Sequence, residues 1–464
     1  MNYPSATVVV GYLSLWATGF AYFVFILKVT GFMASWVINV DDLFSDRKIA
    51  VNSLPPCEFP AIYNFGDSNS DTGAISAAFR PLHPPYGESF FHKPSGRESD
   101  GRLIIDFIAE RLKLPYLNAY LNSVGANYRH GANFATGGST IRRQNETIFE
   151  YGISPFSLDV QIVQFNQFKS MIGDIYNQAK NTPEGDKLPR PEEFAKALYT
   201  FDIGQNDLYT GFRKMSFDQI RASLPDIINQ LASAVQKVYQ QGGRAFWIHN
   251  TGPIGCLPVS VLNVSGPPPG YLDENGCVKA QNDVALEFNS KLKDRILELR
   301  AELPESKITY VDVYAAKYEL ISNAKNLGLA SPLKICCGYH ENFDHIWCGL
   351  KGMINKTEVY GGSCEDPSSF ISWDGIHYSQ FANQWVADHT LNGFFTNPPI
   401  PITHACHPHW MIQRFFQLRS ILVLDRVIFD GASFLLEIHS VMLLDGVWAI
   451  VHWCKFGRIA GFLR

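Results

Sequence analysis

Short apolar runs that end in turn residues alternate with longer amphipathic stretches through the middle of the chain. Four runs rich in β-branched and aromatic residues have the length of buried strands: residues 61–65, 197–203, 244–250 and 307–313. Five longer stretches carry the periodicity of helices: residues 103–112, 159–179, 216–241, 280–302 and 378–395. This alternation predicts an α/β fold with a parallel sheet covered by helices on both faces.

The stretch 216–241 carries local signals for both of its ends. Ser216 and Gln219 form a capping-box pattern at its start, and Gly242 stands where the helix should stop. Pro225 lies inside the same stretch, where its missing N–H predicts a kink or a break into two helices.

A Pro-rich segment, 397–401, follows the last helical stretch and is typical of a domain end. We therefore expect a single domain over residues 57–402. The tail that follows, 403–464, holds an apolar stretch interrupted by charged side chains, which predicts neither a membrane span nor a lipid anchor. No role for this atypical C-terminal tail follows from its sequence.

The chain starts with an apolar segment long enough to cross a bilayer. No charged residue stands between Tyr3 and Leu27, which predicts a secretory signal peptide or a signal anchor within residues 1–52. A buried core helix is the alternative, although such helices rarely lack charge for so long. Cleavage is favoured because no later segment resembles a membrane span, even though the basic start of a usual signal is missing before Lys28. Membrane contact is expected only if this segment is retained.

The cysteines show no zinc-ribbon spacing. There are nine, so at least one thiol stays unpaired within the chain. Cys256 and Cys277 are reasonable neighbours, and a cluster follows later, although spacing does not fix its pairing: Cys336, Cys337, Cys348 and Cys364.

Three Asn-X-Ser/Thr sequons accompany these cysteines, beginning at Asn145, Asn263 and Asn355. Together with the apolar leader, they predict a secreted glycoprotein with disulfide bonds rather than a cytosolic protein. A membrane-anchored protein with a lumenal domain is the alternative.

Charge excludes one class of partner. The formal net charge is −5 and no block of five or more basic residues occurs, so we expect no nucleic-acid binding.

Two His-containing segments resemble metal sites only loosely. His340 and His345 are spaced one place too far apart for a metalloprotease helix, which favours a disulfide-rich loop. A second donor cluster lies just past the expected domain end, where a flexible tail is the preferred interpretation: His404, Cys406, His407 and His409. We expect no metal and no cofactor.

A serine and an Asp/His pair form the strongest chemical signal. Ser68 follows the run 61–65 on a turn that begins at Gly66, so its hydroxyl should be exposed at a strand end. Asp374 and His377 stand three residues apart just before the last helical stretch. A serine nucleophile needs a base within hydrogen-bond reach and a third group to orient that base. Alone, these residues would equally suit a turn serine, a helix cap and a surface histidine.

Two further segments can donate hydrogen bonds to a developing oxyanion, as acyl transfer requires. The Gly-rich segment 131–139 offers a backbone N–H, and Asn206 offers a side-chain amide directly after the run 197–203. Ligands bind at the carboxyl ends of strands in parallel sheets, which is where Ser68 and Asn206 are expected.

These four segments, in the order in which they follow one another along the chain, resemble the GDSL family of the SGNH hydrolases. The chain is most similar to the plant GDSL esterase/lipases and, within them, to the early-nodulin-like group, through PPCEFPAIYNFGDSNSDTG, CCGYHENFDHIWCG and SWDGIHYSQFANQWVA. The resemblance covers roughly residues 57–407. It implies a flavodoxin-like, three-layer α/β/α SGNH hydrolase fold with a parallel sheet.

The resemblance also implies a role for each motif residue. Ser68 would be the nucleophile, His377 the base and Asp374 its orienting acid, with Ser68, Gly137 and Asn206 lining the oxyanion hole. The expected activity is hydrolysis of carboxylic (acyl) esters through an acyl-enzyme, as in lipid degradation, on a small-molecule or polysaccharide ester, in the cell wall or apoplast. The alternatives are a cell-wall polysaccharide deacetylase and a catalytically silent binding or structural glycoprotein.

Overall fold

A computed structural model covers the chain and describes residues 23–29, 32–38, 55–144, 152–179, 181–262, 264, 266–341, 344–408, 440–444 and 447–451. Its contacts divide the chain into two units, one spanning Pro56–Met411 and the other combining Met1–Pro55 with Ile412–Arg464. The second unit holds two antiparallel hairpins: β1(Phe23–Val29) with β2(Phe32–Ile38), and β13(Ser440–Leu444) with β14(Val447–Val451). Most of the expected leader and of the C-terminal tail lies outside the described residues. None of the described helices is long and apolar enough to span a bilayer.

The unit Pro56–Met411 is built on a six-stranded sheet with the order β12-β7-β6-β5-β3-β4. All neighbours in it are parallel except β12, which pairs antiparallel with β7. The strands are β3(Ile62–Gly66), β4(Gly131–Asn133), β5(Leu198–Asp202), β6(Ala245–His249), β7(Lys307–Val311) and β12(Thr396–Asn397). Numbered from β3, the parallel strands have the order 2-1-3-4-5, which is the flavodoxin-like order. The expected fold class and the four expected strands are confirmed.

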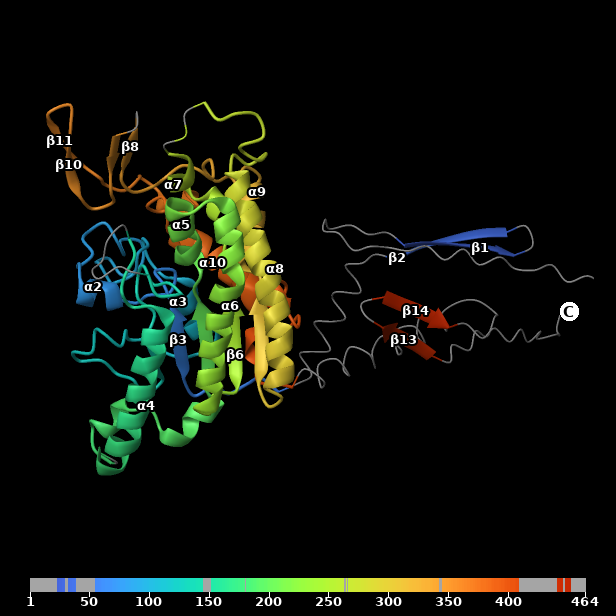
Figure 1. The fold of residues 1–464 in the computed structure, drawn as a ribbon, viewed down its shortest axis with the longest axis horizontal. Coiled ribbons are helices and arrows are strands. Elements are labelled where there is room, and N and C mark those ends of the chain that lie inside the picture. Colours follow the sequence, from blue (N-terminus) through green and yellow to red (C-terminus); the bar gives the residue numbers. More distant parts are fainter. Residues whose placement is uncertain are drawn as a thin grey trace, which may run out of the picture. The chain divides into compact units, whose positions relative to one another are not determined.

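Helices cover this sheet in two groups (Figure 1). One group packs around α6, which contacts α4, α5 and α8, and the other around α10, which contacts α3 and α9. The helices are α2(Ala74–Ala78), α3(Ile104–Arg111), α4(Leu158–Ala179), α5(Gln205–Lys214), α6(Phe217–Gln240), α7(Pro258–Val261), α8(Lys279–Glu302), α9(Val313–Ser322) and α10(Gln380–Leu391). Helices were expected at α3, α4, α6, α8 and α10, and each lies within a few residues of its expected bounds.

Helix α6 begins as its sequence predicts. The Ser216 N–H donates to the Gln219 side chain at 2.9 Å, and Ser216 Oγ accepts from the Gln219 N–H at 3.3 Å. Pro225 lies inside α6 without ending it, so of the two expected outcomes, a kink or a break into two helices, the break is wrong. Nine buried apolar side chains along α6 anchor both halves to the same core, which compensates for the lost backbone bond.

Aromatic side chains fill the space between α4 and the sheet. The rings of Phe65 on β3 and Phe201 on β5 stack with centroids 5.0 Å apart, and Phe165 of α4 meets Phe65 edge-on at 5.6 Å. All three are at most 1% exposed. This rigid layer supports the strand ends from which the candidate site is built.

Four disulfides are present among the described residues. Cys256 pairs with Cys277, as expected, and the cysteine cluster resolves into Cys336–Cys364 and Cys337–Cys348. The latter two bonds lie beside two hairpins at the top of Figure 1: β8(Tyr339–Glu341) with β9(Asp344–Ile346), and β10(Lys351–Ile354) with β11(Thr357–Tyr360). The ninth cysteine, Cys454, lies outside the described residues.

The fourth disulfide joins Cys57 to Cys406 and corrects one expectation. The Cys57 N–H donates to the Thr403 carbonyl at 2.6 Å, and His404 is only 6% exposed. The chain just past residue 402 is therefore packed against the domain, and the flexible tail expected for His404, Cys406 and His407 is wrong there. Neighbouring His409 lies outside the described residues.

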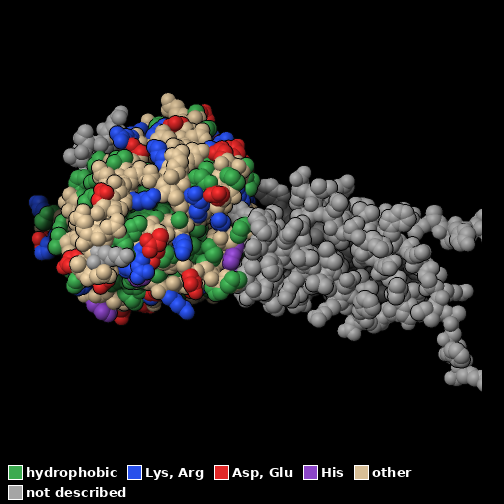
Figure 2. Space-filling model, turned by 90° about the horizontal axis from the view of Figure 1, so that it is seen from below, with side chains coloured by type: hydrophobic (Ala, Val, Ile, Leu, Met, Phe, Trp, Pro, Cys, Tyr) green, Lys and Arg blue, Asp and Glu red, His purple; other side chains and the backbone are tan. Residues whose placement is uncertain are grey.

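Charged side chains of both signs are interspersed on the face of the domain seen in Figure 2, without a continuous basic patch on that face. Of the three sequon asparagines, Asn355 is exposed in the turn between β10 and β11. Asn145 and Asn263 lie outside the described residues.

Candidate active site

Ser68 and Asn206 stand where the order of the sheet reverses. Ser68 follows β3 and Asn206 follows β5, and the last residues of these adjacent strands, Gly66 and Asp202, are register partners. The crevice at such a switch point is the usual ligand site of open α/β sheets. The fold thus brings together two segments that are more than a hundred residues apart in the chain.

The turn that carries Ser68 requires glycine at its start. A Cβ on Gly66 would stand 2.4 Å from Ser70 Oγ and 2.6 Å from the Asp202 carbonyl, so no larger residue fits. Gln161 of α4 holds both backbone groups of Gly66, accepting from its N–H at 3.0 Å and donating to its carbonyl at 2.8 Å. The end of β3 is therefore held both by Gln161 of α4 and by pairing with β5.

Ser68, His377 and Asp374 form a continuous chain of hydrogen bonds. His377 Nε2 lies 2.8 Å from Ser68 Oγ, and His377 Nδ1 lies 2.7 Å from Asp374 Oδ2. A carboxylate only accepts, so Nδ1 carries the proton and Nε2 of the neutral ring accepts from the serine hydroxyl. Ser68 and His377 are each 8% exposed and Asp374 is 3% exposed.

Asp374 also shapes the turn that presents His377. Its Oδ1 accepts the backbone N–H of Ile376 at 3.0 Å and of His377 at 2.8 Å, while Oδ2 holds the imidazole. Tyr86 adds a third support, because its hydroxyl donates to the same Oδ2 at 3.0 Å. Helix α10 begins directly afterwards, with Ser379 as its N-cap.

Neighbouring carboxylates dominate the electrostatics of His377. Burial alone would lower the pKa of this histidine, but the negative charges of Asp374, Glu98 and the more distant Asp67 raise its pKa to about 9. For Asp374, burial acts to raise the pKa, and the adjacent His377 outweighs it and holds the pKa below its usual value. The pair is thus biased towards carboxylate and imidazolium.

Asn206 and Gly137 differ in what they can offer an oxyanion. Asn206, in the first turn of α5, uses one amide hydrogen for the Ser139 carbonyl at 3.0 Å, which leaves the second hydrogen of the amide. The Gly137 N–H instead donates to Asp71 Oδ2 at 2.8 Å. The Asp71 carboxylate also accepts three backbone N–H groups at the start of α2. The expectation that the Gly137 N–H is free to donate to an oxyanion therefore needs correction.

Three residues near the triad were not expected from the sequence: Glu98, Tyr86 and Asp67. Glu98 Oε2 lies 3.3 Å from His377 Nε2, and its side chain is 13% exposed. Neither Glu98 nor Tyr86 belongs to a recognisable motif, and both come from the long loop between α2 and α3, so only the tertiary fold brings them to the site. Asp67 adjoins Ser68 directly, and that adjacency was the one available signal.

Buried charges underlie the nucleophile turn. Asp67 is 1% exposed, and burial and the nearby Asp202 raise its pKa to about 7. Asp202 Oδ2 lies 3.1 Å from His249 Nδ1. Lys317 of α9 is 6% exposed, and burial lowers its pKa in spite of the charges of Asp202 and Asp67. The opposite charges of these groups partly compensate one another, and Asp67 also interacts with His377.

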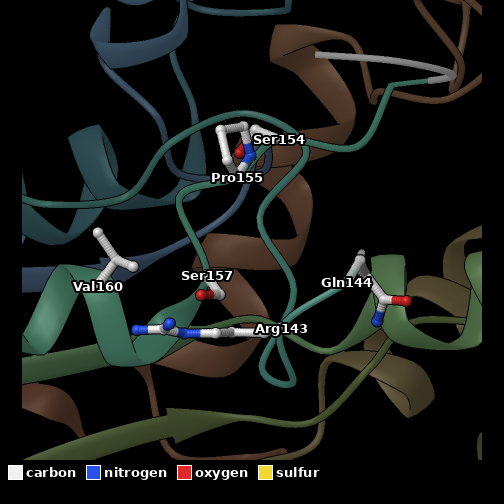
Figure 3. Close-up of a pocket in the computed structure, with 6 residues that line it drawn as sticks. All are labelled: Arg143, Gln144, Ser154, Pro155, Ser157 and Val160. Atoms are coloured by element: carbon white, nitrogen blue, oxygen red, sulfur yellow. The ribbon is translucent and has the colours of Figure 1, made fainter. Parts of the chain in front are cut away.

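A cavity of about 250 Å³ contains none of the triad residues, although its lining residue Ser154 donates its backbone N–H to the Gly138 carbonyl of the Gly-rich segment at 3.0 Å (Figure 3). Its lining consists of Arg143, Gln144, Ser154, Pro155, Ser157 and Val160. Two cysteine-containing clusters have the proximity of metal donors, but their cysteines are bonded to each other as disulfides. Neither feature adds reacting groups to the candidate site.

The assembled residues suit attack by a serine on an acyl carbon. The hydroxyl has a base within hydrogen-bond reach, the base has an orienting carboxylate, and the Asn206 amide follows the end of the neighbouring strand.

Comparison with known proteins shows similarity to esterases and to one protein named for a different activity. The family described as GDSL-like lipase/acylhydrolase matches residues 62–390. A GDSL esterase/lipase of Arabidopsis thaliana is 68% identical over 82% of this chain and 97% of its own length. The GDSL esterase/lipase ENOD8 of Medicago truncatula is 46% identical over 76% of this chain and 91% of its own. A protein named alpha-L-fucosidase 3, from Arabidopsis thaliana, is 48% identical over 73% of this chain and 91% of its own.

Proposed function

Because the chain belongs to the GDSL-like lipase/acylhydrolase family and is a carboxylester hydrolase, we propose that it cleaves acyl esters through a covalent intermediate on Ser68. The hydrogen-bonded chain from Ser68 through His377 to Asp374 is the observation that carries this proposal. Expected from the sequence as three separate residues, these groups meet at distances suited to proton transfer.

In the first step, Ser68 Oγ attacks the ester carbonyl and His377 Nε2 takes the hydroxyl proton. The same proton then passes to the leaving alcohol, whose C–O bond breaks to leave the acyl group on Ser68. Asp374 stabilises the imidazolium and keeps Nδ1 protonated throughout. In the second step, water gives its proton to His377 and attacks the acyl carbon, releasing the acid and restoring Ser68.

The oxyanion is stabilised, in this proposal, by the backbone N–H of Ser68 and the free amide hydrogen of Asn206. One such donor contributes roughly 3 kcal/mol of transition-state stabilisation. Gly137 joins them only if its hydrogen bond to Asp71 opens when substrate binds.

The catalytic domain is proposed to act outside the cytosol. Four disulfides and an exposed sequon asparagine, Asn355, fit an oxidising compartment and N-glycosylation. A domain over residues 57–402, a leader within residues 1–52 and an atypical tail from 403 remain part of the proposal, with the tail contributing at least Cys406 to the packed domain.

The rival proposal is a binding or structural glycoprotein that keeps the fold without turnover. It is disfavoured because the base, the orienting acid and the nucleophile are all of competent types and all within hydrogen-bond distance. A polysaccharide ester as substrate is compatible with the same mechanism.

Hydrolysis of p-nitrophenyl acetate and a long-chain p-nitrophenyl ester by the full chain tests the proposal. Ser68→Ala should lower kcat by roughly 10⁴-fold or more on both esters. Ser76→Ala is the matched control, since the Ser76 hydroxyl has no hydrogen-bond partner among the described residues. Undiminished turnover by folded Ser68→Ala would refute the nucleophile, and a folded but inactive parent chain would favour the binding glycoprotein.

A further inference from the structure

Glu98 is a carboxylate that meets the proposed base at the ring nitrogen used for catalysis. Its Oε2 lies 3.3 Å from His377 Nε2, whereas Asp374 holds the other nitrogen. A Cβ placed on Gly137 would stand 3.4 Å from the same Glu98 oxygen. The carboxylate thus lies between His377 and the Gly-rich loop, beside Ser68. Nothing in the triad requires it, because Asp374 already orients the imidazole.

Its position is fixed by both of its chain neighbours. Arg97 forms a buried ion pair with Asp106 of α3 at 2.6 Å. Ser99 Oγ donates to the carbonyl of Tyr378, the residue after His377, at 3.0 Å. Glu98 is therefore a preorganised part of the site rather than a mobile surface acid.

In the state that is ready to react, this carboxylate lacks a donor from the imidazole. The neutral ring carries its proton on Nδ1, so Nε2 presents a lone pair to the Ser68 hydroxyl and offers nothing to Glu98. A largely buried carboxylate without a hydrogen-bond donor is unfavourable. Arg80 supplies only a longer-range positive charge, and burial leaves the pKa of Glu98 raised. A hydrogen-bond donor from the substrate would remove this deficit.

We propose that Glu98 binds a free hydroxyl on the alcohol half of the substrate, so that the protein prefers esters of polyols in which a hydroxyl neighbours the ester oxygen. Partially acylated sugars and glycerol monoesters share this chemistry. The inference rests on the proposed function, because the position of the leaving alcohol is derived from the proposed serine mechanism.

The geometry of proton transfer supplies the distance argument. The leaving oxygen receives its proton from His377 Nε2 and must approach that nitrogen to about 3 Å. Glu98 Oε2 stands 3.3 Å from the same nitrogen, so the two oxygens are at most about 6 Å apart. A hydroxyl on the carbon adjacent to the one that bears the ester oxygen can bridge this gap and donate to Glu98. An alcohol with no such hydroxyl buries the carboxylate unpaired, which is how polar sites reject analogues.

A matched pair of small esters isolates the effect. The monoacetate of 1,2-propanediol with a free hydroxyl at carbon 2 is compared with its methyl ether at that position. Wild-type kcat/KM should be roughly 10- to 100-fold higher for the hydroxyl ester. Glu98→Leu should abolish this ratio, and Glu98→Gln, which still accepts a hydrogen bond, should retain part of it.

The ratio is taken on one variant at one pH, so a change in the protonation of His377 cancels. A folded Glu98→Leu variant that keeps the wild-type ratio, or a wild-type ratio near one, overturns the inference. A shift of the pH profile in Glu98→Leu without a change in the ratio also overturns it and leaves Glu98 as a residue that only tunes His377. If wild type fails on p-nitrophenyl acetate as well, the proposed function fails instead.

Two further probes distinguish the sources of the hydroxyl. Glycerol 1-monoacetate and a methyl xyloside bearing a single acetyl group both present a hydroxyl next to the ester. A Glu98-dependent preference for either over its fully methylated analogue supports the inference and identifies the polyol. Loss of preference for both, with the propanediol pair also unselective, contradicts it.

Discussion

At the scale of single residues, the account depends on the protonation of His377. Asp374 and Glu98 flank its two ring nitrogens, Asp67 adds a further negative charge, and the Tyr86 hydroxyl contacts Asp374. The sequence indicated His377 as the base and Asp374 as its orienting acid, but it could not supply Glu98. The structural reason is that Glu98 belongs to a loop with no periodicity, placed beside His377 by contacts made far along the chain.

The pH dependence follows from these charges. Catalysis needs the neutral imidazole, and the pKa of His377 is raised to about 9. The unprotonated fraction therefore falls about tenfold for each pH unit below about 9, so kcat/KM should climb through neutral pH and level off only above about pH 9. A kcat/KM profile already flat below pH 7, in protein shown to be folded across the range, would contradict the arrangement.

The orienting role of Asp374 has its own test. Asp374→Asn retains the size of the side chain but can present a donor to Nδ1, which favours the wrong tautomer of His377. We expect kcat to fall by roughly 10⁴-fold with little loss of stability. Activity within tenfold of wild type in a folded Asp374→Asn variant would argue that the imidazole is oriented by other groups.

At the scale of elements, local patterns predicted what local physics determines. The strands β3, β5, β6 and β7 and the long helices follow from apolar runs and periodicity, and the start of α6 follows from its capping box. The short strand β4 and the hairpins β8–β11 were not expected, because their residues form no apolar run and depend on pairing and on disulfides. The hydrogen bond from Gly137 to Asp71 was not expected from the sequence either, since it is a tertiary contact.

Gln161 illustrates how an element positions the nucleophile. Replacing it with Leu removes both hydrogen bonds to the backbone of Gly66 and leaves the buried Gly66 N–H without this partner, whereas the Gly66 carbonyl still accepts the Thr136 N–H at 3.1 Å. We expect the free energy of unfolding to fall by roughly 1–3 kcal/mol and kcat to fall as the turn before Ser68 loosens. Urea unfolding and ester turnover measure the two effects.

The control for that variant lies one turn further along α4. Gln164→Leu changes the same residue type on the same helix, and Gln164 Oε1 has no hydrogen-bond partner among the described residues. Equal effects of the two substitutions would show that the contact with Gly66 is not what matters.

At the scale of the whole molecule, the ends of the domain are tied together. The disulfide between Cys57 and Cys406 spans 349 residues, whereas Cys256–Cys277 spans 21. The sequence indicated a domain end near residue 402 from its prolines, but it could not reveal that Cys406 returns to Cys57. Pairing across such a distance depends on the complete fold, which local spacing does not encode.

The long-range disulfide should contribute more to stability than the short one. Closing a longer loop removes more entropy from the unfolded chain, so replacing Cys57 and Cys406 by serine should lower the free energy of unfolding by about 2–5 kcal/mol. The matching replacement of Cys256 and Cys277 should cost roughly 2 kcal/mol less. Equal or reversed losses in urea unfolding would show that native-state packing, rather than loop closure, sets the effect.

Covalent labelling of Ser68 tests the central claim most directly. A fluorophosphonate reacts with an activated serine, and peptide mass spectrometry of the full chain then identifies the modified residue. We predict stoichiometric labelling of Ser68 that is lost in Ser68→Ala and strongly slowed in His377→Ala, with the buried neighbour Ser70 unmodified. Esterase-active protein that is labelled at another serine, or that is not labelled at all, would contradict the account.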